Sequence, residues 1–192
     1  MNVLIAVASK YGATRDIADE IAGVLQQKGI DTDTQACDAV VDVDGFDAVI
    51  VGSAVYAGRW RPEAMTFVSD HAAQLESIPV WLFSSGPLGD PPKPQEDPSD
   101  LDDLTALVNV RGHAVFAGSL DKANLSLGEK AIVKLVKAPY GDFRPWETIR
   151  AWADHIAEVL SSRSMSMSMP VPALGPDDGR LPAHHDRELR PD

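Results

Sequence analysis

The fold class follows from residues 3–29, which read VLIAVASKYGATRDIADEIAGVLQQKG. The first six residues of this stretch are all apolar, which is typical of a β-strand buried on both faces. After a short polar loop, apolar residues recur at four-residue intervals and predict an amphipathic helix, at Ile17, Ile21 and Leu25. Gly29 stands where such a helix needs a C-terminal cap. The stretch therefore predicts a strand, a loop and a helix in that order.

The same alternation continues along the chain. Four more strands are expected at Ile30–Cys37 (at an edge), Ala48–Val55, Val80–Ser84 and His113–Ala117, and helices at Pro62–Leu75, after an N-cap at Ser99, and at Ile149–Leu160. Repeated strand–helix alternation predicts an α/β protein with a doubly wound, five-stranded parallel sheet and helices on both faces. Ligands of such sheets bind at the carboxyl ends of the strands, so the loops that follow the strands form the candidate site.

The composition excludes several classes of protein. The chain has 192 residues, a net charge of −12 and one cysteine, Cys37, so we expect no nucleic-acid binding, no disulfide framework and no metal site. No apolar run approaches the roughly 20 residues of a transmembrane helix, and no secretory leader is recognised, which predicts a cytoplasmic protein. We expect one domain over residues 1–160, with an insertion at about residues 121–146, and a disordered tail over residues 161–192.

The loop after the first strand, Ser9–Thr14, has the features of a phosphate site. It offers two hydroxyl groups, a glycine that permits close approach, and free N–H groups at the start of a helix. It lacks the GK[ST] of a Walker loop and the G-x-G-x-x-G of a dinucleotide site. Ala8 and Ser9 stand where a receiver domain needs acidic residues. A plain capped turn is the alternative interpretation.

Two further loops offer room for a flat ligand. Gly52–Trp60 is rich in small residues, and Tyr56 or Trp60 can cover a ring there. Ser84–Gly89 opens a proline-rich, acidic stretch that extends over Asp90–Asp103 and is not expected to form a helix or an inner strand. We expect this acidic stretch to be solvated; a docking surface for a basic electron-transfer partner is the alternative.

Together the three loops resemble the FMN site of flavodoxins, and the chain is similar in particular to the menaquinone-dependent protoporphyrinogen IX dehydrogenase family. Within about residues 1–160, the segments that carry the closer resemblance are Gly12–Ala18 (GATRDIA), Gly52–Gly58 (GSAVYAG), Ala117–Leu120 (AGSL) and Ile132–Val136 (IVKLV). Tyr11 and Ala13 differ from the threonine and asparagine common in ordinary flavodoxins. Ala57 separates Tyr56 from Gly58, which are adjacent in the family.

The resemblance implies a flavodoxin-like fold with FMN as cofactor. Ser9, Thr14 and the loop amides would hold the phosphate. The ring and the ribityl chain would be lined by Ser53, Tyr56 and Ser85. The full set of cofactor-binding candidates is Ser9, Lys10, Tyr11, Gly12, Ala13, Thr14, Ser53, Ala54, Val55, Tyr56, Ala57, Gly58, Ser84, Ser85 and Gly86.

The resemblance also implies an enzyme that passes electrons from a porphyrinogen-like substrate to a quinone. No catalytic residue is assigned. Arg59 and Arg61 are candidates for contact with a substrate carboxylate or for stabilising negative charge on the reduced flavin, unless they are ordinary surface arginines. One alternative is a flavodoxin-type electron-transfer protein with a redox partner protein and no organic substrate of its own. A flavodoxin-fold module that has lost the flavin is another.

Within the insertion, the segment Ser126–Ala138 (SLGEKAIVKLVKA) predicts a short basic amphipathic helix. Lys130, Lys134 and Lys137 recur at i, i+4 and i+7 and therefore fall on one side. Such a helix would let the protein rest on the inner face of the cell membrane, where a quinone is dissolved. A helix packed on the core with a solvated lysine face is the competing interpretation.

Overall fold

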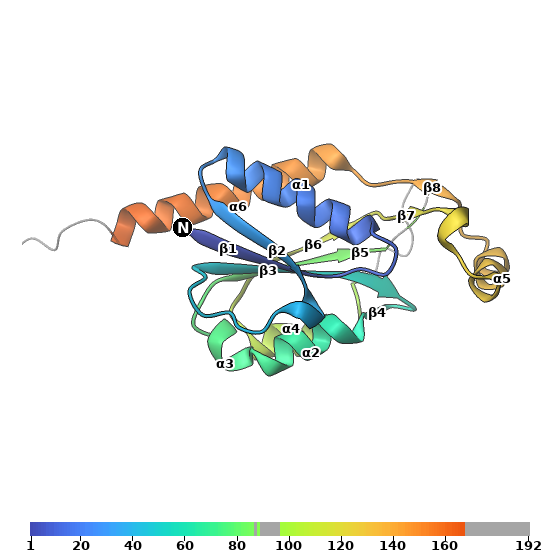
Figure 1. Ribbon diagram of the computed structural model, residues 1–192, viewed down its shortest axis with the longest axis horizontal. Coiled ribbons are helices and arrows are strands. Elements are labelled where there is room, and N and C mark those ends of the chain that lie inside the picture. The colour runs from blue at the N-terminus through green and yellow to red at the C-terminus, as the bar shows by residue number, and fades with distance from the viewer. Residues whose placement is uncertain (87, 89–96, 168–192) are drawn as a thin grey trace, which may run out of the picture.

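The centre of the computed structural model is a parallel sheet; the structure describes residues 1–86, 88 and 97–167 (Figure 1). The strands run in the order β2-β1-β3-β5-β6, and all neighbours are parallel. Their bounds are β1 Asn2–Ala8, β2 Asp31–Ala36, β3 Ala48–Tyr56, β5 Val80–Ser85 and β6 Val110–Phe116. The predicted five-stranded parallel sheet is confirmed, with the polar strand β2 at an edge.

Helices cover both faces of the sheet, as predicted (Figure 1). One face carries α1 (Ala13–Gln27) and α6 (Trp146–Met167); the other carries α2 (Pro62–Asp70), α3 (Ala72–Leu75) and α4 (Leu101–Leu107). A short turn of 3-10 helix, Cys37–Ala39, follows β2.

The continuous apolar run of β1 is explained by two separate cores. Val3, Ile5 and Val7 pack in the cluster that contains the buried residues of α1 and α6. Leu4 and Ala6 point to the opposite cluster, which contains the buried residues of α2 and α4. Because successive side chains of a strand alternate between faces, a central strand must be apolar at every position.

Two helix predictions require correction. The helix expected over Pro62–Leu75 is interrupted at His71, whose backbone angles (φ −105°, ψ 12°) leave the helical range and separate α2 from α3. Ser99 does not cap α4: the N-cap residue is Asp100, and no side chain caps this helix. The Ser99 amide instead donates to the Gly58 carbonyl at 3.0 Å, which fixes Ser99 against the turn after β3.

Two boundaries also differ from the predictions. β6 begins at Val110, so His113 lies inside this strand and does not open it. Helix α6 continues to Met167, seven residues beyond the expected boundary at residue 160. The hydroxyl groups of Ser161 and Ser162 donate to carbonyls one turn earlier, which lets these serines continue the helix. The rest of the expected tail, residues 168–192, lies outside the described residues.

The insertion extends beyond the carboxyl end of the sheet (Figure 1). Two short antiparallel strands, β7 (Ser119–Leu120) and β8 (Gly141–Asp142), form its base, and a 3-10 turn (Lys122–Asn124) and α5 (Leu127–Val136) lie between them. In the part of the chain that the structure describes, no helix is long and apolar enough to cross a membrane.

Candidate functional site

The candidate site lies where the strand order reverses, between β1 and β3. The chain leaves β1 to build β2 on one side and crosses back to build β3, β5 and β6 on the other. Ala8 pairs with Ser53, and Ala54 pairs with Ser85, so the three predicted loops follow neighbouring strand ends. Such a reversal leaves a crevice at the carboxyl edge, because the two connections turn to opposite faces of the sheet.

The loop after β1 has the geometry of an anion cradle. Gly12 is the N-cap of α1 and has a φ of 92°, a conformation that L side chains rarely adopt. Its amide donates to the Ser9 hydroxyl oxygen at 3.1 Å. Among the described residues, no group accepts a hydrogen bond from the amides of Ala13, Thr14 and Arg15. Because these donors are unpaired and lie at the positive end of the α1 dipole, they can bind a phosphate.

The segment after β3 is a hairpin and not an open loop. β3 runs through Tyr56 and pairs with the two-residue strand β4 (Arg59–Trp60). Ala57 and Gly58 form its turn and both have positive φ, 51° and 77°, which is the geometry of a type I′ turn. Tyr56 remains 46% exposed. The hairpin reaches the first loop, since the Lys10 Nζ lies 6.0 Å from the centre of the Tyr56 ring.

The third predicted loop begins with a close approach of backbones. A Cβ on Gly86 would lie 3.0 Å from the Val55 carbonyl, so a larger residue would push the loop away from β3. The Gly86 amide donates to the Phe116 carbonyl, which ties the loop to the end of β6. The first half of the acidic stretch expected over Asp90–Asp103, residues 90–96, lies outside the described residues.

Comparison with known families agrees with this geometry. The family model of the flavodoxin domain matches residues 4–144. The chain belongs to the flavodoxin domain family. Its strand order and the position of its site follow the rule for doubly wound sheets, for which flavodoxin with its FMN is a standard example. Membership of the flavodoxin family assigns FMN as the cofactor.

Individual relatives are distant but align over nearly their full length. A protoporphyrinogen IX dehydrogenase (quinone) from Escherichia coli K12 is 24% identical over 180 residues, which cover 86% of this chain and 99% of the relative. Among solved structures, an archaeal flavodoxin has a TM-score of 0.58 at 14% identity and covers 84% of this chain and 99% of its own. A flavodoxin from Streptococcus pneumonia TIGR4 has a TM-score of 0.58 at 22% identity, with 83% and 99% covered.

The first loop of this flavodoxin-family chain fits the phosphate of FMN. A Cβ at Gly12 would have no heavy atom within 4 Å, so the space at the N-cap is open. The Thr14 side chain is 2% exposed, and within the described chain its hydroxyl group has no hydrogen-bond partner. An open N-cap, three free amides and an unpartnered hydroxyl are the donor set that a phosphate dianion requires.

Two of the predicted serines lie below the surface of the flavodoxin site. Ser53 is fully buried, accepts from the Arg61 amide at 2.9 Å and donates to the Ala54 carbonyl. Ser84 is also fully buried, and its hydroxyl oxygen accepts from the Trp60 indole N–H at 2.8 Å. These hydroxyl groups are used inside the protein, so they hold the hairpin in place.

Trp60 cannot cover the ring, contrary to one of the two expectations for this aromatic pair. Its side chain is 3% exposed and turned inward, and its amide donates to Asp100 at 3.1 Å. Tyr56 is therefore the aromatic residue of the hairpin that is left to cover a flat ligand. Partial burial raises the pKa of the Tyr56 phenol further above neutral pH, so this hydroxyl is protonated there as it would be at its ordinary pKa.

His113 joins the same buried network, which the sequence did not reveal. Its Nε2 lies 2.9 Å from the Ser84 hydroxyl oxygen, and its Nδ1 lies 3.7 Å from Asp97. Burial lowers the pKa of His113, although Asp97 acts in the opposite direction. The neutral ring thus supports Ser84 from the strand β6.

The two arginine candidates already have carboxylate partners. Arg61 contacts Glu63 through its guanidinium and is 20% exposed. Arg59 is 72% exposed and lies 3.8 Å from Asp100. A substrate carboxylate would therefore have to compete with a carboxylate of the protein at either residue.

A residue that sequence reasoning missed, Glu129, joins the insertion to the phosphate loop. One carboxylate oxygen accepts from the Lys10 ammonium at 2.6 Å and from the Tyr11 hydroxyl. The other accepts from the amide and the hydroxyl of Ser126, which completes a capping box at the start of α5. Hydrogen bonds from Lys10, and then from Ser126 and Tyr11, hold the pKa of Glu129 far below its usual range.

Arg144 makes a second contact between the insertion and the flavodoxin phosphate loop. Its guanidinium, which is 11% exposed, donates to Asp16 at 2.7 Å and to the Ala13 carbonyl at 3.3 Å. It also pairs with Asp142 in β8, and the hydrogen bond from Arg144 lowers the pKa of this carboxyl. The insertion is therefore joined to the phosphate loop through Glu129 and to the first turn of α1 through Arg144.

Proposed function

We propose that this chain is an FMN-dependent oxidoreductase that oxidises a porphyrinogen-like substrate and delivers the electrons to a quinone. The observation that carries the proposal is the alignment with protoporphyrinogen IX dehydrogenase (quinone), which covers 86% of this chain and 99% of that relative. The contacts of Glu129 and Arg144 with the phosphate loop support it, because they make the insertion part of the cofactor site.

In this proposal FMN supplies the redox chemistry, and the chain supplies binding and orientation. The amides of Ala13, Thr14 and Arg15 and the Thr14 hydroxyl hold the phosphate, as described for the loop above. Tyr56 covers the ring, and the buried hydrogen bonds of Ser53 and Ser84 fix the hairpin that carries it. The substrate loses electrons and protons, and the quinone takes up an equal number of each to become a quinol.

Electron transfer between proteins, without an organic substrate, is the second candidate. Its support is the likeness to flavodoxins that the chain covers almost completely, at 99% of each of the two structures described above. These two activities place different demands on the protein. The enzyme needs a binding site for an organic molecule, whereas the shuttle needs only an exposed flavin edge and a docking surface.

The deciding experiment uses the FMN-loaded protein under anaerobic conditions. Porphyrinogen is added with a soluble quinone, and porphyrin formation is followed by fluorescence. The enzyme proposal expects turnover that depends on both FMN and the quinone. No porphyrin above the FMN-free control, together with rapid electron exchange with a flavodoxin reductase, would establish the shuttle.

We also propose that α5 holds the protein at the membrane surface through Lys130, Lys134 and Lys137. Leu127 and Leu135 are 87% and 82% exposed, which speaks against a helix packed on the core. α5 ends at Val136, so Lys137 is not helical; it caps the helix with a φ of 54°. Exposed leucines beside lysines are typical of interfacial helices.

The expected strength is modest. Each lysine near an anionic surface contributes about 1 kcal/mol, or about 3 kcal/mol in all before salt screening. Co-sedimentation with anionic liposomes should therefore fall with added salt. It should also fall in Lys130→Glu/Lys134→Glu/Lys137→Glu, while Leu127→Ser/Leu135→Ser tests the apolar part. Equal sedimentation of the wild type and the lysine variant would contradict the proposal.

A further inference from the structure

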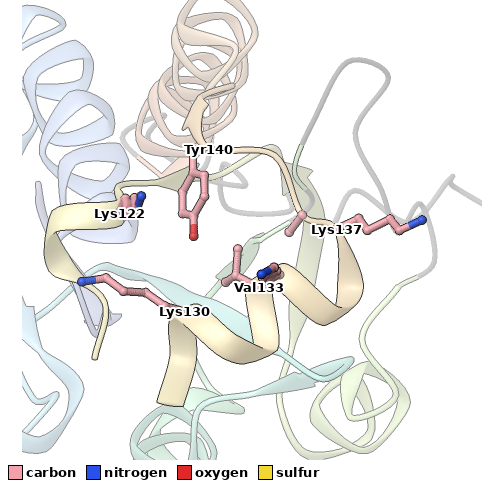
Figure 2. Close-up of a pocket in the computed structure, with 7 residues that line it drawn as sticks. Lys122, Lys130, Val133, Lys137 and Tyr140 are labelled. Carbon is pink, nitrogen blue, oxygen red and sulfur yellow. The ribbon is translucent and has the colours of Figure 1, made fainter. Parts of the chain in front are cut away.

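A lysine-lined cavity lies between α5 and the segments that enter and leave the insertion (Figure 2). Its volume is about 440 Å³, and its lining residues are Lys122, Lys130, Val133, Lys134, Lys137, Ala138 and Tyr140. Figure 2 shows Tyr140 projecting from the returning segment toward α5, with its hydroxyl group between the two. Lys122 and Lys130 lie on one side of this hydroxyl, whereas Lys137 extends away on the other.

The charges of this cavity are not balanced by the described part of the protein. None of the described residues that line it is acidic. The lysines that line it form no ion pair with a described carboxylate, in contrast to Lys10, Lys28 and most of the described arginines. Unpaired cations around one cavity, in a chain with a net charge of −12, favour an anionic ligand.

We propose that this cavity binds the carboxylate groups of the organic substrate, in place of Arg59 and Arg61. The inference rests on the proposed function, since a porphyrinogen carries propionate side chains. Ammonium groups and a phenol hydroxyl donate charge-assisted hydrogen bonds to a carboxylate. Val133 and Ala138 offer apolar contact for the methylene groups of a propionate arm.

The position of the cavity suits such a role. Glu129 and Lys130 are consecutive residues in the first turn of α5, and they face different sides. Glu129 contacts Lys10 in the phosphate loop, while Lys130 lines the cavity. The helix that carries the cavity is thus fixed directly to the loop that holds the cofactor.

The test compares two stable probes that share one ring system and differ at two carboxyl groups, which are free in one and methylated in the other. Mesoporphyrin IX carries two free carboxylates, and its dimethyl ester carries none. Binding of each probe to the FMN-loaded protein is measured by fluorescence in the same non-ionic detergent. Two ion pairs at a largely solvated site should make the diacid bind about tenfold more tightly than the diester.

The variant Lys122→Gln/Lys130→Gln should abolish this preference and raise KM for the porphyrinogen about tenfold with kcat unchanged. Tyr140→Phe should reduce the preference in part. Arg111→Gln is the matched control, because Arg111 is an exposed cation of β6 with no ion pair among the described residues, and it should change nothing. Tyr140 is not among the residues proposed for membrane contact, so the effect of Tyr140→Phe reports on the cavity alone.

A preference for the diacid that persists in the lysine variant, or that is lost in Arg59→Gln/Arg61→Gln, would overturn the inference and leave the proposed function standing. Absence of porphyrinogen oxidation by the wild-type protein would instead refute the proposed function. If the diacid then still binds through Lys122 and Lys130, the cavity is a carboxylate site for another substrate. If both probes bind equally, the carboxylate site is refuted together with the proposed function.

Discussion

Replacing Gly12 by glutamate is the sharpest test of the phosphate loop. Gly12 begins α1 with a φ of 92°, and a Cβ there would have no heavy atom within 4 Å. Gly29 follows the other end of the same helix with a φ of 79° and equally open space. Gly12→Glu and Gly29→Glu therefore introduce the same side chain and the same kind of backbone strain at opposite ends of α1.

The two variants should differ in stability in a known direction. A non-glycine residue in the left-handed region costs about 1–2 kcal/mol, which applies to both. A carboxylate gains about 0.3–1 kcal/mol at a helix N-terminus and loses a similar amount at a C-terminus. Gly29→Glu should therefore be the less stable of the two, and each kcal/mol lowers Tm by about 2–4 °C in a chain of this size.

Affinity for FMN should be lower in Gly12→Glu than in Gly29→Glu, although Gly12→Glu is the more stable variant. A carboxylate about 5 Å from a phosphate dianion is repelled by about 1.7 kcal/mol even at the dielectric constant of water. This corresponds to about twentyfold weaker binding. The effective dielectric constant of a partly buried site is lower, so Gly12→Glu should lose at least this factor. Gly29→Glu should bind FMN as the wild type does.

Both quantities are accessible with the purified protein. Quenching of FMN fluorescence gives the dissociation constant, and thermal unfolding without FMN gives Tm. Wild-type FMN affinity in Gly12→Glu would refute the assignment of the phosphate to this loop. Equal loss of affinity in both variants would show that the effect comes from the fold and not from the site.

Substitutions or reactivity at three other positions give separate tests. Thr14→Ala should weaken FMN binding about tenfold or more with little change in Tm, because a hydrogen bond to a charged group contributes about 1.5–3 kcal/mol and this hydroxyl has no described protein partner; unchanged affinity would contradict its role. Burial raises the pKa of Cys37 to about 12, so the thiol should react with Ellman's reagent at pH 8 only after unfolding. Burial lowers the pKa of His113, so its neutral form stabilises the fold above pH 6.5 and this contribution is lost as the pH falls below 6.5, through the folded-state pKa. His113→Gln should therefore lose less Tm than the wild type between pH 7 and pH 5, and parallel curves would show that this histidine does not titrate on unfolding.

The fold could be predicted because its signals are local. The run at Val3–Ala8 and the spacing of Ile17, Ile21 and Leu25 each lie within one element, and the structure uses them as expected. The loop between the first strand and the first helix was predictable for the same reason, since a strand, a glycine-containing loop and a helix are consecutive. The order of the strands in space was not predicted beyond the edge position of the polar second strand, because periodicity does not determine which strands are neighbours.

The hairpin and its support could not be predicted from periodicity. Ala57-Gly58 occupies a turn that normally favours asparagine or aspartate before glycine, so the usual hairpin signal was missing. Trp60 was one of two candidates, with Tyr56, to cover the ligand, because both are large aromatic residues near the site. Its indole is instead held by Ser84, which is 24 residues away, and its amide by Asp100, which is 40 residues away. Such polar partners depend on tertiary structure.

Glu129 was not among the predicted site residues, although the sequence contains a signal for one of its two roles. Ser126 followed three residues later by Glu129 is the sequence pattern of a capping box, and the structure contains that box. The same carboxylate also reaches Lys10, 119 residues earlier in the chain. A capping pattern predicts the start of a helix, and it says nothing about which loop the other carboxylate oxygen will meet.

The way the insertion is held has a consequence for how the site works. Hydrogen bonds and ion pairs join the insertion to the rest of the protein here. Glu129 contacts Lys10 and Tyr11 in the loop, and Arg144 contacts Asp16 in the first turn of α1. α5 exposes its leucines, whereas the sheet is held by two apolar cores. Contacts between partly exposed charges weaken with ionic strength, and apolar cores do not. Added salt should therefore weaken the attachment of the insertion before it lowers the stability of the sheet. A ligand that binds the cavity lysines contacts α5, which is attached to the cofactor loop through Glu129.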